Sequence, residues 1–363
     1  MRSLVEPLRP ALVEAHWWVS PEELVALAPM AGMTDTAFRR LVKRKGGCGL
    51  VVTEMVSSEG LVRGIDRTLE YAEYTEEERP VSIQIFGGDP AVMADAAEIV
   101  QGMGADIVDI NMGCPVPKIA KHHAGCSLMR DPAHAASVVR AMTDRVRIPV
   151  TVKMRAGWNE HEMNAPTLAK MVADAGAAAV AVHGRTAAQS YKGEADWTFI
   201  GGVANAVDIP VFGSGDCVEA GHVVDRLRDS GVSGVLVGRG ALRNPWIFAQ
   251  AADATHGGAV REVSAEERGR FLLEYIELLL NERVGEQRGF RHAAPGAETS
   301  APAPARGRER WVINKIRALG SWYTKGLIGG SELRTTINAT ESIDALRDTI
   351  RTFFSVSEEL VAG

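Results

Sequence analysis

The chain has 363 residues, of which 46% are hydrophobic and 24% are charged, and its formal net charge is −6. This composition is ordinary for a soluble globular protein. The negative total excludes a protein coated in basic charge, so a polyanion would have to bind at local basic patches. No apolar run approaches the length of a membrane span, and no basic segment precedes an apolar one near the N-terminus. We therefore expect a cytoplasmic protein without a membrane anchor.

Short apolar runs recur along the first two thirds of the chain, and helical patterns fill most of the gaps between them. The runs are Leu24–Ala28, Gly49–Thr53, Val81–Phe86, Asp106–Ile110, Val150–Met154, Ala179–His183, Pro210–Gly213 and Gly234–Val237. Examples of the helical patterns are Asp35–Lys45, Pro90–Met103, Asn164–Ala175 and Val218–Asp229. Apolar strands that alternate with helices form a parallel sheet covered on both faces, and eight such units predict an α/β fold, a (β/α)8 TIM barrel. A doubly wound sheet is disfavoured because no glycine-rich dinucleotide fingerprint follows the first run.

The remainder of the chain predicts a smaller C-terminal α-helical domain. Ala265–Asn281 has the pattern of an amphipathic helix, whereas Glu286–Arg310 is rich in Ala, Pro, Gly and Arg and predicts a mobile linker. Trp311–Lys325 predicts a basic amphipathic helix with aromatic side chains, which suits an RNA-facing element, and Asp344–Phe354 predicts a packing helix. We expect a monomer with three parts. Residues 1–255 would form the catalytic barrel, residues 256–310 a helix and a flexible linker, and residues 311–363 the helical domain.

The cysteines are scattered, and one of them stands in a special place. Cys48, Cys126 and Cys217 form no CxxC pair, which fits a reducing compartment and argues against a disulfide framework. Cys114 lies in the stretch NMGCPVPK at residues 111–118, directly after the fourth predicted strand. The prolines stiffen this loop and hold the thiol at a strand end, where barrel enzymes place reactive groups. A small buried cysteine is the alternative interpretation.

Other polar and glycine residues gather at the same predicted rim. Gln84 and Lys153 lie within two further strands and His183 ends a third, although a buried ion-pair lysine and a hydrogen-bonded core histidine are alternative interpretations. Glycine-rich turns follow the seventh and eighth strands, where this fold binds phosphate through backbone N–H groups, and Arg239 adds a phosphate partner. A phosphorylated cofactor held there would put its ring beside the polar side chains. No HxH, HExxH or carboxylate cluster has ligand spacing, so we expect no metal.

Ordered motifs make the chain resemble the tRNA-dihydrouridine synthases, with the greatest likeness to the bacterial B-type branch. The resemblance runs from about Leu27 to Phe248 and, more weakly, from Trp311 to Phe354. The motifs are APMAGMTD at 28–35, DINMGCP at 109–115, KMRAG at 153–157, HGRT at 183–186 and GRG at 238–240.

The resemblance implies a flavoenzyme that reduces uridine in tRNA to 5,6-dihydrouridine, with FMN as cofactor and NADPH as reductant. FMN N5 would give a hydride to C6 of the base, and Cys114 would give a proton to C5. The residues implied to contact FMN are Pro29, Met30, Ala31, Gln84, Lys153, His183, Ser214, Gly215, Asp216, Gly238 and Arg239. Those implied to contact the RNA substrate are Asn111, Arg155, Lys315 and Arg317.

Two positions depart from the family pattern. Ser214 stands where asparagine is usual, which puts one flavin contact in doubt, and Cys126 stands where serine or alanine is usual, which adds a thiol near the site. Two other classes stay open, namely an FMN barrel dehydrogenase that acts on a free small molecule, as dihydroorotate dehydrogenases do, and a tRNA-binding flavoprotein without turnover. The basic tail argues against the first class, and the intact loop of Cys114 argues against the second.

Overall fold

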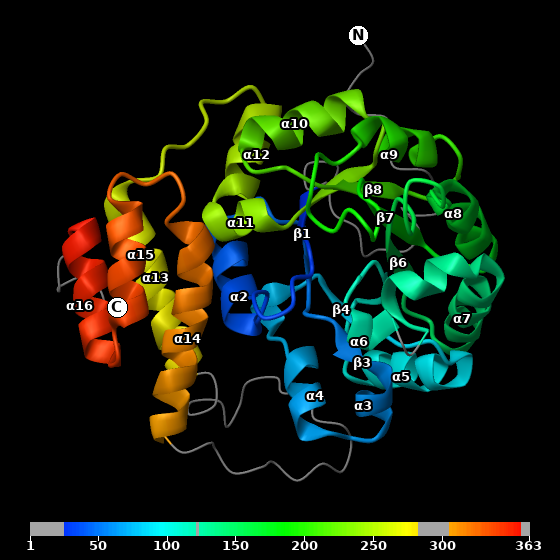
Figure 1. Cartoon of the computed structure of the whole chain (residues 1–363), viewed down its shortest axis with the longest axis horizontal. Coiled ribbons are helices and arrows are strands. Elements are labelled where there is room, and N and C mark those ends of the chain that lie inside the picture. Colours follow the sequence, from blue (N-terminus) through cyan, green and yellow to red (C-terminus); the bar gives the residue numbers. More distant parts are fainter. Residues whose placement is uncertain (1–24, 121–122, 282–304, 357–363) are drawn as a thin grey trace.

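The computed structural model describes residues 25–120, 123–281 and 305–356, and a closed barrel of parallel strands forms its centre (Figure 1). Closure comes from β1, which pairs with both β2 and β9, and from the pairing of β2 with β4. A short strand, β3 (Val56–Ser57), pairs with the end of β4. The barrel strands are β1 (Val25–Leu27), β2 (Leu50–Val52), β4 (Val81–Phe86), β5 (Ile107–Met112), β6 (Val150–Arg155), β7 (Ala179–His183), β8 (Val211–Ser214) and β9 (Gly234–Val237). The predicted TIM barrel is confirmed.

Each strand divides its apolar side chains between the barrel interior and the surrounding helices. Ala26, Ile107, Ala181 and Phe212 belong to a small buried cluster that is separate from the main core. The alternate residues of the same strands, such as Val108, join the main core under the helices. Both faces are therefore covered, which explains why the strands read as near-continuous apolar runs.

Helices cover the outside of the barrel, and several begin at capping residues visible in the sequence. Asp35 accepts the N–H of Phe38 at the start of α2, and Asp89 caps α5 in the same way. The predicted helices are confirmed, with no start or end shifted by more than two residues. The helices and 3₁₀ turns of the barrel are α2 (Thr36–Lys45), α3 (Ser58–Val62), α4 (Asp66–Ala72), η1 (Glu76–Glu78), α5 (Pro90–Gly102), α6 (Pro117–Ala120), η2 (Gly125–Arg130), α7 (Pro132–Arg145), α8 (Ala165–Asp174), α9 (Trp197–Ala204), α10 (Ala220–Asp229), α11 (Arg239–Arg243) and α12 (Ile247–Thr255).

A group of four helices stands beside the barrel, next to α2 and α11 (Figure 1). They are α13 (Ala265–Asn281), α14 (Ala305–Tyr323), α15 (Gly330–Ala339) and α16 (Ile343–Phe354). α13 has the bounds that the sequence predicted. The prediction of a linker as far as Arg310 is wrong from Ala305 onward, where α14 begins, and residues 282–304 lie outside the described part. No helix within the described ranges is long and apolar enough to cross a membrane.

Aromatic side chains join the helical domain to the barrel. Phe271 of α13 meets Phe38 of α2 edge-on, with ring centroids 6.1 Å apart, and stacks on Tyr323 of α14 at 5.7 Å. Trp246, which precedes α12, lies 5.5 Å from the same ring. All four side chains are buried, and such pairs stabilise by about 0.5–1.5 kcal/mol beyond their area burial. The barrel and the helical domain therefore share one core.

Candidate active site

A hydrogen-bonded chain of polar side chains crosses the middle of β4, β5 and β6 and reaches Asn111 near the carboxyl end of β5. The Nε2 of Gln84 donates to Asp109 Oδ2 at 2.7 Å, and Gln84 Oε1 accepts from Asn111 Nδ2 at 2.7 Å. Thr151 Oγ1 donates to the other carboxylate oxygen of Asp109 at 2.6 Å. Burial raises the pKa of Asp109, although these two hydrogen bonds oppose the shift. The chain fixes the orientation of the Gln84 amide at the barrel mouth.

The loop of Cys114 is held from three sides. Asn111 Oδ1 accepts the backbone N–H groups of Gly113 and Cys114 at 3.1 and 2.9 Å. Arg155 Nε donates to the carbonyl of Gly113 at 2.8 Å, and the N–H of Cys126 donates to the carbonyl of Cys114 at 3.1 Å. Cys114 is only partly buried, whereas the other cysteines are buried. The structure thus places this thiol on a fixed loop at the rim and not in the core.

Cys126 contributes its backbone to this arrangement, while its side chain is shielded. Burial raises the pKa of its thiol to about 11, and Cys114 adds to the shift while Arg155 opposes it. The thiol therefore stays protonated near neutral pH and is a poor nucleophile. Cysteine at position 126, where the family usually has serine or alanine, leaves the hydrogen bond to the Cys114 carbonyl intact, because its donor is the backbone N–H of residue 126.

Lys153 and His183 lie on neighbouring strands next to the chain of polar residues. The register pairs Lys153 with Asn111 across β5 and β6, and Arg155 with His183 across β6 and β7. Burial, with help from Arg155, lowers the pKa of Lys153 to about 8. Burial and then the nearby Lys153 and arginines lower the pKa of His183 to about 2. His183 is therefore a neutral hydrogen-bonding group, and Lys153 is a cation that loses its proton easily.

The ends of β8 and β9 form a basic corner around Asp216. Its carboxylate accepts Arg185 Nη2 at 2.7 Å, the N–H of Ala195 at 2.7 Å and Arg239 Nη2 at 3.2 Å. Burial raises the pKa of Asp216, but the hydrogen bonds from Ala195 and Arg185 outweigh this effect and lower it. One carboxylate shared between two guanidinium groups leaves this corner with a net positive charge.

Two glycines form part of the backbone of the same corner, and a side chain on the first of them would clash. Gly215 has φ +134°, and a Cβ there would lie 2.3 Å from the Cβ of Ala195. Gly238 precedes α11, and a Cβ on it would lie 3.5 Å from Met30 Sδ in the loop after β1. The loop that carries Pro29 and Ala31 therefore adjoins the corner. The structure brings together the predicted cofactor residues from β1, β8 and β9.

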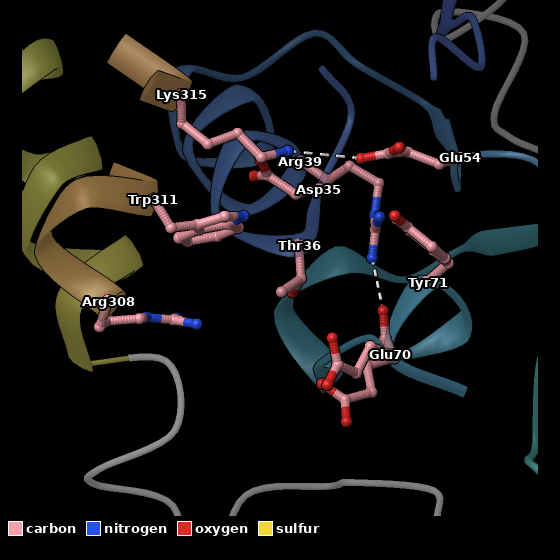
Figure 2. Close-up of a pocket in the computed structure, with 10 residues that line it drawn as sticks. Asp35, Thr36, Arg39, Glu54, Glu70, Tyr71, Arg308, Trp311 and Lys315 are labelled. Atoms are coloured by element: carbon pink, nitrogen blue, oxygen red, sulfur yellow. Dashed lines mark hydrogen bonds and ion pairs between the residues drawn. The ribbon is translucent and has the colours of Figure 1, made fainter. Parts of the chain in front are cut away.

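Lys315 and Arg317 do not join this cluster. Lys315 reaches from α14 to the base of the β1 loop, where its Nζ lies 2.9 Å from Asp35 Oδ2 (Figure 2). Arg317 donates to the carbonyl of Thr340 at 2.7 Å and to Asn314 Oδ1 at 3.2 Å, within the helical domain. Both side chains bind protein groups, and a contact with tRNA remains a prediction for each.

Several residues of the site were not singled out from the sequence. Asp109 and Arg185 stand inside two of the motifs, and a charged residue in or beside a buried strand is a usable signal because it needs a partner. Thr151 and Tyr191 carried no such signal. Tyr191 becomes visible only in space, where its ring lies 4.9 Å from the Arg239 guanidinium and 5.7 Å from that of Arg155.

Comparison with known proteins agrees with this geometry. The family model described as Dihydrouridine synthase (Dus) matches residues 26–311. The "Probable tRNA-dihydrouridine synthase" of Rickettsia conorii is 35% identical over 336 residues, which cover 91% of this chain and 93% of that protein. The "tRNA-dihydrouridine synthase B" of Pseudomonas aeruginosa is 37% identical over 337 residues, with coverages of 92% and 93%.

Among solved structures, histamine dehydrogenase from Rhizobium sp. 4-9 superposes with a TM-score of 0.54 at 12% identity. The match covers 76% of this chain and 51% of that one, so this chain spans about half the length of that protein. At this identity the likeness shows the barrel fold alone. The match to the family model and the similarity to the two relatives show more than the fold. On this evidence the chain belongs to the dihydrouridine synthase family.

Proposed function

We propose that this protein reduces specific uridines of tRNA to 5,6-dihydrouridine, with FMN as cofactor and NADPH as reductant. Family membership supports the reaction class. The observation that carries the proposal is the partly exposed thiol of Cys114 on a loop fixed by Asn111 and Arg155. A thiol on an unrestrained loop, or one buried in the core, would not suit a directed proton transfer.

The basic corner fits the phosphate of FMN. Arg239 has about a third of its side chain exposed, and the two arginines exceed the single charge of Asp216. Guanidinium groups bind phosphate through paired hydrogen bonds, and the backbone of Ser214, Gly215 and Gly238 offers N–H groups beside them. Asp216 would then orient the two arginines with its carboxylate and contribute its backbone to the phosphate site.

The neighbouring side chains fit the flavin ring. We assign its contacts to Gln84, Lys153 and His183, together with the backbone of the loop from Pro29 to Ala31. Lys153 is a cation in a buried setting and suits an electron-rich ring edge, whereas neutral His183 offers one donor and one acceptor. When bound, FMN reduced by NADPH would supply the hydride, and the protein would supply orientation and a proton.

Cys114 is assigned the proton transfer. Hydride addition to C6 of uracil leaves negative charge that requires a proton at C5. A thiol is a modest acid, and general acids contribute about 10²–10⁴-fold to such steps. Asn111 and Arg155 are assigned to the face of the target uridine, and because both also bind the cysteine loop they would align the thiol with the base. The base has to leave its stack to reach them, at a cost of a few kcal/mol.

The test is an anaerobic assay with purified protein, NADPH and tRNA transcripts that carry no modification. We expect flavin absorbance in the protein, and dihydrouridine formed in proportion to the NADPH consumed. Fully modified tRNA is the matched control and should consume none, while NADH in place of NADPH tests the choice of reductant. Binding of flavin and tRNA without dihydrouridine would identify a non-catalytic flavoprotein. Consumption of NADPH with orotate in place of tRNA would support the small-molecule alternative.

A further inference from the structure

Lys315 joins the helical domain to the loop that follows β1. Its Nζ lies 2.9 Å from Asp35 Oδ2, 2.9 Å from the carbonyl oxygen of Gly32 and 3.6 Å from Glu54 Oε1. The Lys315 side chain is 14% exposed, that of Asp35 12% and that of Glu54 6%. Figure 2 shows Lys315 on α14 reaching Asp35 and Glu54, and all three residues line one pocket together with Trp311. The ammonium group of Lys315 therefore binds groups of the barrel and is shielded from solvent.

Gly32 is held on both sides of its backbone. Its N–H donates to Glu54 Oε2 at 2.5 Å, and its carbonyl accepts from Lys315. The residue has φ +80° and lies in the turn in which the Met33 N–H donates to the Met30 carbonyl. The position of this turn thus depends on the side chain of Glu54, two residues after β2, and on one from α14. The same turn carries Met30 and Ala31, which adjoin the basic corner.

Electrostatics makes the lysine necessary to this arrangement. Asp35 and Glu54 are two shielded carboxylates near one ammonium group. Burial raises the pKa of Glu54, and Lys315 is the largest influence that opposes the shift. Arg39, a second cation near Glu54, already donates to Glu78 and to the carbonyls of Thr34 and Glu73. Without Lys315 the two carboxylates would repel each other, and the Gly32 carbonyl would lose this donor.

We propose that Lys315 is a positioning residue that couples the docking of the helical domain to the shape of the cofactor loop. Through Gly32 it holds the backbone of Pro29 to Ala31 in the form that faces the flavin. The inference rests on the proposed function for the identity of the cofactor. It also gives the helical domain a second task, because the domain then completes the flavin site as well as contributing to RNA binding.

The experiment compares Lys315→Met with Lys315→Arg and with Arg347→Met in the full-length protein. Arg347 is the matched control, because its pair with Glu277 at 2.6 Å is also partly shielded, with side chains 23% and 38% exposed, and lies wholly within the helical domain. Each variant is measured for FMN affinity, for the visible spectrum of bound flavin and for the rate of flavin reduction by NADPH. Hydrogen exchange of residues 29–35 is followed in FMN-free protein, and tRNA affinity and melting temperature complete the set.

For Lys315→Met we expect FMN affinity to fall by about tenfold, as the loss of a charge-assisted hydrogen bond implies. Hydrogen exchange in residues 29–35 should quicken, the flavin spectrum should shift and tRNA affinity should stay within about twofold of the parent. Lys315→Arg should recover most of the FMN affinity. Arg347→Met should lower the melting temperature without changing the flavin spectrum.

Two results would overturn the inference. Weakened tRNA binding with normal flavin properties would make Lys315 a phosphate contact, and equal flavin loss in the Arg347 variant would mean general destabilisation. If Lys315→Met does not fold, Glu54→Gln tests the same turn, and unchanged exchange of residues 29–35 in that variant would count against the network. Failure of the proposed function is separable, since it would appear as a parent protein that binds no flavin or forms no dihydrouridine.

Discussion

The side-chain oxygen of Asn111 accepts the backbone N–H groups of both Gly113 and Cys114, while its amide nitrogen donates to Gln84. A single side chain thus connects a proposed contact of the flavin ring to the loop of the proposed acid. Gln84 Nε2 donates to Asp109, so Gln84 Oε1 is the atom that faces Asn111. The amide nitrogen of Asn111 must therefore point to Gln84, and its oxygen must point to the cysteine loop. The geometry of the thiol is consequently set by the strand ends and not by the loop alone.

Asn111→Ala should reduce dihydrouridine formation far more than flavin reduction. The change removes the acceptor for two backbone N–H groups, and unsatisfied groups of this kind cost about 1–3 kcal/mol of stability. Asn159→Ala is the matched control, because Asn159 Oδ1 accepts the N–H groups of His161 and Glu162 in an exposed turn. Melting temperature and product yield measure both effects. Normal yield from the Asn111 variant would mean that the cysteine loop keeps its shape unaided.

Cys114→Ala should keep bound FMN and its reduction by NADPH but lose most dihydrouridine formation. The thiol is assigned only to the proton transfer, for which a loss of about 10²–10⁴-fold is expected. Cys48→Ala, at a buried cysteine before β2, should retain full yield. Product formation at the parental rate in the Cys114 variant would remove it from the mechanism, and loss of flavin would show that its role is structural.

Lys153→Met should slow flavin reduction by NADPH and weaken FMN binding. Burial lowers the pKa of Lys153 to about 8, which means that the charged form is destabilised inside the protein. An electron-rich partner such as the flavin ring would offset that destabilisation. Lys170→Met, at an exposed lysine of α8, is the matched control and should change neither quantity. Anaerobic stopped-flow reduction and FMN titration are the measurements. Unaltered values in both would move the ring contact away from Lys153.

How far the sequence predicts this structure differs between the barrel and the tail. The strands were predictable because both faces of each are buried, so their apolar character does not depend on distant partners. α15 was missed because Leu333 and Ile337 are its main apolar residues in a threonine-rich stretch. The position of Lys315 was not predictable, since a helical pattern shows which residues share a face but not what that face meets. Its partner Gly32 lies 283 residues earlier in the chain.

His183 predicts a pH dependence of stability in FMN-free protein. Its folded pKa of about 2 lies below the ordinary value of 6.5, so below pH 6.5 the unfolded chain binds a proton that the folded chain does not. Stability should therefore fall as pH drops below 6.5, by up to about 1.4 kcal/mol per pH unit from this group. Urea unfolding of the parent and of His183→Gln between pH 7 and pH 5 isolates the contribution. Parallel curves would contradict it, and His256→Gln, at an exposed histidine, should follow the parent.

The last prediction concerns the basic residues of the tail that remain exposed. Arg310 lies near the start of α14 and Lys325 just after its end, and both are exposed, unlike Lys315. Point substitutions are the appropriate test, because a truncation would uncover Phe38 and Trp246 in the shared core. Arg310→Ala with Lys325→Ala should weaken tRNA binding and reduce the slope of log affinity against log salt by about 0.9 per lost phosphate contact in duplex regions.

Lys170→Ala is the control for that pair of substitutions. Lys170 is exposed on α8, which Figure 1 shows on the side of the barrel away from α14. It should leave the affinity and the salt slope at parental values, because a general effect of net charge would act equally from either side. An unchanged slope in the double variant would exclude both residues as phosphate contacts. The basic segment of α2, in which Lys43 and Arg44 lie, would then be the next surface to test.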